Sequence, residues 1–535
     1  MKFIKLLAFV FLTLFGYTQQ ISFAYGVSLK PITITNLPGV HSFAFAQSND
    51  KWLIVGGRLD GLHARQPFNA FPASSNNNNL YVVDVALGQF WSAPLTSLSV
   101  SIQEQLQSTN MNFYQDNDTL YIIGGYGYSN TSLDHITYPN LTSIHVSGLI
   151  SAIISNSSIT PFIKQITHQN FAVNGGQLGK IGDTFYLVGG HRFDGRYNPM
   201  GNPTYTQTYV SGIKTFKLNN SGSLPSFSNY NLISDQVHLH RRDYNLLPFV
   251  YQNGELGYLI SSGVFQNSVN LPFLYPVEIK SSGYTPITSF NQYLSNYHSA
   301  KVSLFDSVAN TMHSVFFGGM SQYKYVNSAM VQDNNVPFVK TISRISKDGN
   351  GNWQENVFAN EMPSLIGASA EFVPNHHLAH YKNEVLKMNS FTTDSIKIGH
   401  ILGGIFSPQE NPFTNNQTSV TNAHPTIYEV WLKKESGATS IKPVNGENPL
   451  NAKIYPNPVK SKIEAIVNLP EDGTVYVMVT DNLGKLVHED RYDDLGKGQN
   501  QLIIDRDKQL SNGVYYVNFN FKGLYYYTEK IILSR

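Results

Sequence analysis

Short apolar segments that end in a pair of glycines recur along most of the chain. Each is a run of about five aliphatic or aromatic residues, which is the length and composition of a buried strand. The pairs are Gly56-Gly57, Gly124-Gly125, Gly189-Gly190, Gly318-Gly319 and Gly403-Gly404, and a degenerate copy ends in Ser262-Gly263. A strand unit repeated at this scale is typical of a propeller or a solenoid, so the pattern predicts an all-β repeat protein.

The repeats resemble kelch repeats over about residues 30–432. The resemblance implies blades of four strands, in which the glycine pair closes the second strand. Apolar runs fit the third strand of five blades, at 80–85, 213–218, 275–279, 338–345 and 427–432. Trp91 and Trp353 fit the start of a fourth strand. The copies are spaced more widely than the roughly 50 residues of a standard repeat, so the excess belongs in loops.

The two ends of the repeat region complement each other. Residues 31–38 form an extended segment with no inner strand before it, and the sixth copy ends after its third strand at Trp431. If the N-terminal segment supplies the missing outer strand, the ring closes and no sheet edge stays exposed. A seventh blade would need another glycine pair. We therefore predict a six-bladed kelch-like β-propeller over residues 25–435.

The last 80 or so residues carry a second set of motifs. In chain order they comprise Tyr455, Pro456, Asn457, Pro458, Gly484, Lys485, Gly513, Tyr515 and Lys530. Apolar runs at 474–480, 501–504 and 514–521 are strand-length segments separated by turns that contain glycine, which predicts a small β-sandwich. The motifs resemble the type A C-terminal sorting domain of the type IX secretion system. The alternative is an ordinary C-terminal sandwich without a role in export.

The sorting-domain resemblance implies an address for export, and it makes the secretion machinery a partner. We place this domain at residues 451–535. The small, polar segment 436–450 before it reads as a linker. In the sorting-domain family, cleavage after export falls close upstream of the domain, which is where this linker lies.

The N-terminus also fits export. Lys2 and Lys5 precede an apolar run at 6–16, which is too short to span a bilayer and has the form of a signal-peptide core. We expect a signal peptide over residues 1–24, cut after Ala24, with Gln19 and Gln20 as alternative positions. No later segment approaches a membrane-spanning length. The predicted location is the outer cell surface or the medium, reached through the periplasm.

Composition removes several classes of function. Of the 535 residues, 14% are charged, and the formal net charge is +1, which gives no electrostatic basis for binding nucleic acid or an anionic membrane. The chain has no cysteine. A lipoprotein anchor, thiolate metal sites and cysteine nucleophiles are therefore excluded, and the apolar core has to stabilise an exported protein without disulfides.

The candidate ligand site comes from the loops. In kelch domains two sets of loops surround the central channel on one face, and here these loops are rich in His, Arg and Tyr. A guanidinium suits carboxylate recognition, and aromatic rings suit stacking on sugars. The alternatives are that each His hydrogen-bonds its own turn, that Asp243 pairs with an arginine, and that Asp-Gly turns explain the repeated loop motif. The candidates are Arg58, Arg65, His168, His191, Arg192, Arg196, Tyr197, His240, Arg241, Arg242, His298 and Tyr323.

Motifs for metals and cofactors are weak. His376 and His380 have a spacing that zinc ligands use, but they lie in a loop that kelch geometry places on the opposite face. The segment from Asp348 fails as a calcium loop because Trp353 occupies the glycine position. A copper radical site like that of galactose oxidase needs a cysteine. We therefore expect no metal and no cofactor.

Two functions remain open. The first is a surface-delivered propeller that binds a glycan, a peptide or a surface partner. The second is a metal-independent carbohydrate-active enzyme that resembles the six-bladed kelch sialic-acid mutarotases. A buried carboxylate with a raised pKa opposite Arg241 or Arg242 would favour the enzyme, because acid/base chemistry needs such a group.

Overall fold

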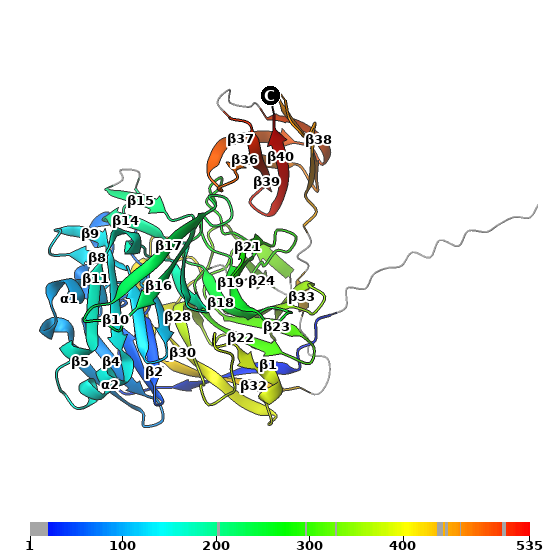
Figure 1. Ribbon diagram of the computed structural model, residues 1–535. Coiled ribbons are helices and arrows are strands. Elements are labelled where there is room, and N and C mark those ends of the chain that lie inside the picture. The colour runs from blue at the N-terminus through cyan, green and yellow to red at the C-terminus, as the bar shows by residue number, and fades with distance from the viewer. Residues whose placement is uncertain are drawn as a thin grey trace, which may run out of the picture.

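A computed structural model describes residues 20–200, 204–294, 297–326, 329–435, 442–444, 448–460, 462–504 and 510–534. Over these residues the chain is all-β, with a large body of several sheets and a smaller C-terminal body above it (Figure 1). The apolar run predicted as the signal-peptide core lies outside the described residues.

The larger body contains six antiparallel sheets that share one plan of four strands. The first three are β2 (Ala44–Ser48), β3 (Lys51–Val55), β4 (Asn79–Asp84) and β5 (Gln89–Pro94); β6 (Asn112–Asp116), β7 (Thr119–Ile123), β10 (Asn140–His145) and β11 (Ile163–Thr167); and β12 (Gln177–Ile181), β13 (Thr184–Val188), β16 (Gly212–Asn219) and β17 (Ser226–Ser234). The next two are β18 (Asn245–Val250), β19 (Leu256–Ser261), β20 (Val277–Lys280) and β21 (Gly283–Pro286); and β22 (Ala300–Asp306), β23 (Thr311–Phe317), β26 (Ile342–Lys347) and β27 (Trp353–Val357). The sixth is β28 (Leu365–Pro374), β30 (Ser395–Ser407), β32 (Ile427–Lys434) and β1 (Tyr25–Ile32).

Smaller elements decorate these sheets. Three hairpins project from them: β8 (Tyr126–Ser129) with β9 (Asp134–Thr137), β14 (His191–Gly195) with β15 (Tyr205–Tyr209), and β24 (Tyr323–Val326) with β25 (Ala329–Gln332). Short strands β29 (Leu386–Lys387), β31 (Asn422–Ala423) and β33 (Lys442–Val444) pair with β22, β30 and β27. Helix α1 (Val100–Leu106) connects β5 of the first sheet to β6 of the second, and helix α2 (Val146–Ile154) lies between β10 and β11 of the second sheet. Among the described residues, no helix has the length and apolar character to cross a membrane.

The first strands of neighbouring sheets pack against one another in order. β2 contacts β6, β6 contacts β12, and the series continues through β18 and β22 to β28. The amide of Ser42, just before β2, donates a hydrogen bond of 3.1 Å to the carbonyl of Ser369 on β28. The sixth sheet is thereby joined to the first, and the body has a β-propeller-like layout.

The outer strand of the sixth sheet comes from the N-terminus. β1 pairs with β32 over eight residues, from Tyr25 opposite Lys434 to Ile32 opposite Ile427. The sequence predicted an outer strand from the N-terminus, which is confirmed. The predicted range of 31–38 was wrong, because the strand begins at Tyr25 and ends at Ile32. Burial sets the register: Val27 is 1% exposed in the core between sheets, whereas the chain beyond Ile32 leaves the sheet in a turn.

The glycine pairs lie where neighbouring sheets approach most closely. Both glycines of all five pairs have positive φ, a conformation that other residues rarely adopt. A Cβ atom on Gly124 would lie 1.7 Å from the carbonyl oxygen of Val173, which enters the next sheet. On Gly403 it would lie 2.2 Å from the carbonyl oxygen of Val40, which enters the first sheet. In the degenerate copy, Ser262 takes this backbone position at φ 59°.

The C-terminal body consists of two sheets with one core. The first is β34 (Asn451–Tyr455), β35 (Ile463–Leu469) and β38 (Gly498–Ile504). The second is β37 (Leu486–Leu495), β36 (Gly473–Asp481), β39 (Gly513–Phe521) and β40 (Tyr525–Leu533). Inward side chains of both sheets, Val477 and Phe519 among them, form one buried cluster. All three strand segments expected here from the sequence are present.

The C-terminal body docks on the larger one through a defined contact. The side-chain amide of Gln266, in the loop between β19 and β20, donates to the carbonyl of Gly523 at 2.9 Å and accepts from Asn520 at 3.0 Å. Beside it, the ring of Tyr526 packs on Tyr275 with centroids 4.6 Å apart. Buried polar groups and aromatic packing therefore hold the two bodies together.

Removing β1 tests the closure of the sixth sheet. Deleting residues 25–32 should lower the free energy of unfolding by several kcal/mol, because core packing and a complete strand ladder are lost together. Urea unfolding monitored by tryptophan fluorescence measures the change. A deletion variant as stable as the intact chain would show that β1 is dispensable.

A candidate ligand site at the central channel

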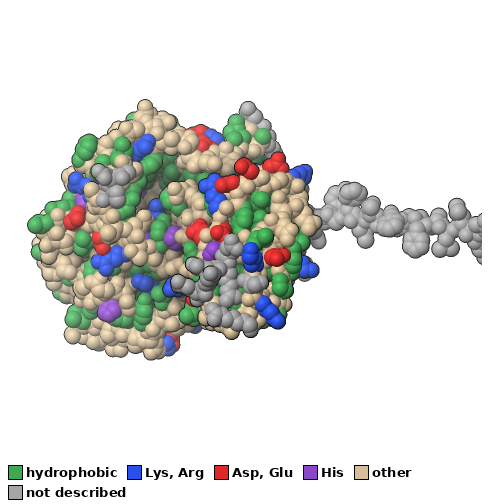
Figure 2. Space-filling model, turned by 90° about the horizontal axis from the view of Figure 1, so that it is seen from above, with side chains coloured by type: hydrophobic (Ala, Val, Ile, Leu, Met, Phe, Trp, Pro, Cys, Tyr) green, Lys and Arg blue, Asp and Glu red, His purple; other side chains and the backbone are tan. Residues whose placement is uncertain are grey.

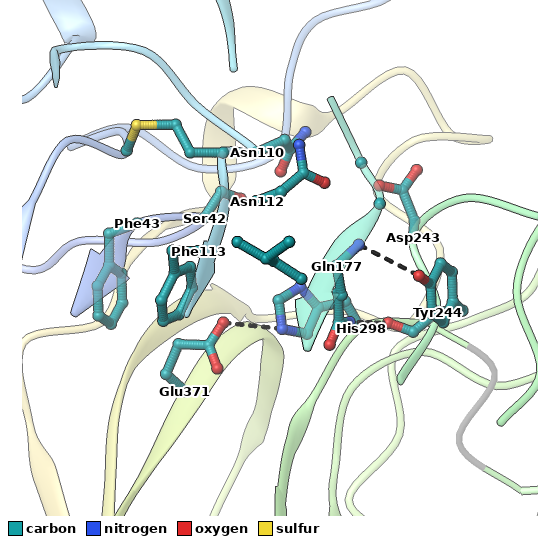
Figure 3. Close-up of a pocket in the computed structure, with 14 residues that line it drawn as sticks. Ser42, Phe43, Asn110, Asn112, Phe113, Gln177, Asp243, Tyr244, His298 and Glu371 are labelled. Carbon is teal, nitrogen blue, oxygen red and sulfur yellow. Dashed lines mark hydrogen bonds and ion pairs between the residues drawn. The ribbon is translucent and has the colours of Figure 1, made fainter. Parts of the chain in front are cut away.

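A pocket lies where the first strands of all six sheets meet. Its walls come from the starts of the first five of these strands and the residues just before them, and from Glu371 within β28 (Figure 3). The lining residues are Ser42, Phe43, Asn110, Met111, Asn112, Phe113, Gly175, Gly176, Gln177, Leu178, Asp243, Tyr244, His298 and Glu371. The cavity volume is about 60 Å³, which holds a few water molecules but not a sugar ring. A larger ligand has to bind outside this narrow part.

His298 and Glu371 face each other across the pocket (Figure 3). His298 precedes β22 and Glu371 lies on β28, and Nε2 of the imidazole is 2.8 Å from Oε1 of the carboxylate. Burial opposes the charge of Glu371, but His298 and Lys301 outweigh it and lower the pKa of this carboxyl group. Glu371 is therefore ionised at neutral pH, and the contact is an ion pair when His298 is protonated.

Arg242 supplies a positive charge beside the pocket. Its Nη1 is paired with the carboxylate of Asp243, a pocket residue, and its Nε donates to the hydroxyl of Tyr209 at 3.1 Å. The guanidinium also lies over the ring of Phe265. Burial opposes the charge, yet Asp243 and Tyr209 raise the pKa of Arg242, so that it stays ionised. Among the described residues, Nη2 has no hydrogen-bond partner, and 22% of the side chain is exposed.

Aromatic and neutral histidine side chains surround Arg242. His240 stacks on Tyr209 with ring centroids 3.8 Å apart, and His63 packs edge-on against Tyr197 at 4.7 Å. Burial and the charge of Arg242 lower the pKa of both histidines to about 4. These imidazoles are therefore uncharged at neutral pH. The positive charge of Arg242 is thus surrounded by the rings of His63, Tyr197, Tyr209 and His240, which we call the aromatic collar. These rings offer stacking surfaces and uncharged hydrogen-bonding groups.

A buried ion-pair cluster supports one side of this region. Arg58 is 2% exposed and donates from Nε to Asp60 at 2.8 Å and from Nη1 to Asn76 at 2.9 Å. Although burial raises it, hydrogen bonds from His41 and Arg58 lower the pKa of Asp60 to about 2. All three nitrogen atoms of the Arg58 guanidinium donate hydrogen bonds within the protein. Arg58 therefore positions the loop between β3 and β4.

The space-filling view from above shows a hollowed face on which hydrophobic and uncharged polar side chains dominate (Figure 2). Charged side chains are scattered over this face and form no continuous basic or acidic patch. This agrees with the near-neutral composition of the chain.

The structure brings together part of the predicted set. Three of its members, His191, Tyr197 and His240, lie near enough to Arg242 for its charge to act on their pKa values, and a fourth, His298, lines the pocket. Arg65 is at the rim, where its guanidinium lies 5.6 Å from the ring centroid of Phe413. Arg196 lies close enough to Tyr126 and His135 for its charge to act on their pKa values.

Other members of the predicted set have structural roles. Arg241 is 1% exposed and donates to the carbonyls of His238, Ser262 and Tyr275, so it cannot reach a ligand. His168 caps the short helix Gln169–Phe171 by accepting from the amide of Asn170. Arg192 pairs with Asp194 and Gln169. Tyr323 packs edge-on against Tyr293.

Three residues of the site were missed from the sequence. Glu371 lies in an inner strand without any local motif, and Tyr209 lies in a hairpin within a loop. Phe265 follows the degenerate repeat. Burial raises the pKa of the Glu355 carboxyl group to about 8, but this group accepts from the amides of Tyr293 and Leu294 and does not line the pocket. Among the described residues, the one group of metal-type ligands is His376, His380 and Glu384, also outside the pocket.

Acid titration tests the buried cluster around Asp60. Because its pKa is lowered on folding, Asp60 stabilises the fold above about pH 4, and the effect is lost as the pH falls towards 2. Asp60→Asn should cost about 1–2 kcal/mol of unfolding free energy at neutral pH, with the gap closing in acid. Urea unfolding at several pH values measures this. Asp183→Asn, at an exposed turn, is the control and should show no such gap.

Comparison with known proteins assigns the C-terminal body. Residues 453–534 match the family model of the secretion system C-terminal sorting domain. The match confirms the type IX sorting domain predicted for this region and supports export to the cell surface or the medium. No curated protein matches the sequence.

Among solved structures, the chain is similar to that of YjhT, at 11% identity and a TM-score of 0.40 over 74% of this chain and 97% of that one. It is also similar to the crystal structure of a glycoside hydrolase family 43 arabinoxylan arabinofuranohydrolase from Bacillus subtilis in complex with cellotetraose, at 11% identity and a TM-score of 0.28 over 94% and 96% of the two chains. Likeness at this level identifies no activity.

Proposed function

We propose that the protein is a type IX-exported β-propeller that binds a carboxylate-bearing glycan or peptide at the mouth of its central channel. The six sheets are the blades of a kelch-like propeller over residues 25–435, closed by β1. The observation that carries the binding proposal is Arg242, which is held ionised among aromatic rings. Its side chain is 22% exposed, and its Nη2 has no hydrogen-bond partner among the described residues.

The chemistry of the collar favours a small organic anion over a simple ion. A guanidinium pairs with carboxylates through directed hydrogen bonds, and Asp243 and Tyr209 fix the orientation of this one. The rings of Tyr197 and Tyr209 give the apolar surface on which a sugar ring or an aliphatic side chain packs. Because Asp243 already neutralises much of the charge, affinity for inorganic anions is expected to be low.

Carboxylates in the channel favour binding over catalysis. A general acid needs a raised pKa, but the pKa of Glu371 is lowered. Glu355 has a raised pKa, but it lies outside the pocket and accepts from backbone amides. The alternative is the metal-independent carbohydrate-active enzyme. The His298–Glu371 pair is what favours it, because an imidazole beside an ionised carboxylate is suited to moving a proton. Acceleration of the anomeric exchange of N-acetylneuraminic acid, seen by NMR and lost in His298→Ala, would establish this alternative.

The packing of Phe23 supports one cleavage position for the signal peptide over another. This ring is 6% exposed and lies 4.4 Å from the guanidinium of Arg344, a residue with 0% exposure. Cleavage after Ala24 would remove the ring and uncover a buried charge. Cleavage after Gln19 or Gln20 keeps it, so we propose the earlier position for removal of the signal peptide.

Ligand binding is testable with acidic sugars. Isothermal titration of the full chain with N-acetylneuraminic, glucuronic and galacturonic acids should reveal a binder. Arg242→Gln should then weaken it by about 10- to 100-fold, since a charge-assisted hydrogen bond contributes about 1.5–3 kcal/mol. Arg192→Gln is the matched control, because this arginine pairs with Asp194 and Gln169 and does not line the pocket, and it should change affinity less than twofold. Equal loss in both variants would place the site elsewhere.

Export is testable by truncation. Deleting residues 452–535 should leave the propeller in the periplasm, because the address is gone while the six sheets keep all their strands. Fractionation and immunoblotting measure the distribution. Gln266→Ala, which weakens docking of the C-terminal body but keeps the sorting domain, should still be exported. Truncated protein at the cell surface would refute the assignment of the address.

A further inference from the structure

Three metal-type ligands meet on a loop between β28 and β30. They are His376, His380 and Glu384, and their ligand atoms all lie within 4.8 Å of one another. Nε2 of His376 is 2.6 Å from Oε2 of Glu384, and the two imidazole rings stack with centroids 5.1 Å apart. The cluster is outside the channel pocket and uses none of the residues that line it.

The loop holds these side chains on a fixed backbone. The side chain of Asn375 accepts from the amide of His377 and closes the first turn, and the amide of Glu384 donates to the carbonyl of Tyr381 in the second. Within the second turn, buried Asn383 donates its side-chain amide to the carbonyl of Phe249 in the fourth sheet at 3.0 Å. The arrangement is therefore anchored to the body of the protein.

Hydrogen bonding also sets the free nitrogen of His380. Its Nδ1 lies 2.8 Å from the carbonyl oxygen of Leu378, so Nδ1–H is the donor. The lone pair is then on Nε2, as in the metal-binding imidazoles whose second nitrogen is fixed by a backbone carbonyl.

Two neighbours make competing demands on Nε2 of His376. Its Nε2 faces the carboxylate of Glu384, which requires a proton on that nitrogen, and also the side-chain amide nitrogen of Gln47 at 3.0 Å, which requires a lone pair. Rotating the Gln47 amide does not help, because the same nitrogen donates to the carbonyl of Pro374 at 3.3 Å. A metal ion between Nε2 and the carboxylate replaces the proton that the contact with Glu384 requires, since both atoms then donate electron pairs to the ion. The half-buried Gln47 amide then keeps its bond to the carbonyl of Pro374 and gives up the contact with Nε2.

We propose that His376, His380 and Glu384 form a zinc site. Two imidazoles and one carboxylate are a ligand set that zinc takes, with the fourth position left to water, whereas calcium and magnesium prefer oxygen alone. Tetrahedral zinc places its ligand atoms about 3.4 Å apart. Small side-chain rotations reach this from the observed positions, and the partial exposure of all three residues permits them.

The site lies at the junction of the sixth and first sheets. Gln47 belongs to β2 of the first sheet, and Nε2 of His377 contacts Asp50 in the turn after β2 at 2.8 Å. A metal on this loop would therefore strengthen the seam at which the last sheet meets the first. Its role is structural, and it does not depend on the ligand proposed for the channel mouth.

Zinc titration of the full chain tests the site. Protein stripped with a chelator and dialysed at about pH 7 should bind one equivalent of Zn²⁺ in isothermal titration, with a dissociation constant of about 10 µM or lower, and its thermal midpoint should rise. His380→Ala and Glu384→Gln should each weaken binding at least 10-fold and abolish the thermal shift. Glu384→Gln keeps the shape of the side chain, so folding is not at risk.

His377→Ala is the matched control, because it removes a neighbouring exposed histidine that the site does not use. Its zinc affinity should stay within about twofold of the unchanged chain. The proposal is overturned if the unchanged chain takes up less than one equivalent at about 100 µM free zinc. It is equally overturned if His376→Ala/His380→Ala binds as tightly as the unchanged chain, or if His377→Ala loses as much affinity as His380→Ala.

Discussion

The close approach of backbone to backbone between neighbouring sheets is the constraint on which the larger body depends. At Gly124 and Gly403 no Cβ atom fits, because a carbonyl oxygen of the next sheet occupies its place. The positive φ of these residues turns the chain sharply out of the second strand and into the loops of the channel mouth. One repeated backbone feature thus sets the spacing of the sheets, the width of the channel and the position of the loops that carry the candidate site.

This constraint also explains what was predictable from the sequence. Glycine pairs after apolar runs are a local signal, so the second strand of each sheet was found directly, including the copy with Ser262. The sorting domain was equally visible because its motifs are local. The position of β1 was not, because its register depends on pairing with residues some 400 positions later. Helices α1 and α2 were missed, since they are short and lie within loops.

The site was less predictable, for a geometric reason. Arg241 and Arg242 are neighbours in the chain, and sequence alone treated them alike. In an extended segment adjacent side chains point in opposite directions, so Arg241 is buried among backbone carbonyls while Arg242 faces the mouth. Glu371, by contrast, carries no local motif, and only the meeting of six strands places it opposite His298.

The pairing of β1 with β32 has a consequence for the order in which the protein folds. Tyr25 lies opposite Lys434, so the closing ladder joins residues at the two ends of the domain. Contacts between residues so distant in the chain form slowly, because a very long loop has to be ordered first. Five sheets can assemble from continuous segments while the sixth still has an open edge along β32. The first strand to leave the ribosome is therefore among the last to pair. Until it does, the unpaired edge of β32 can pair with another chain, so the protein is most prone to aggregate before β1 is in place.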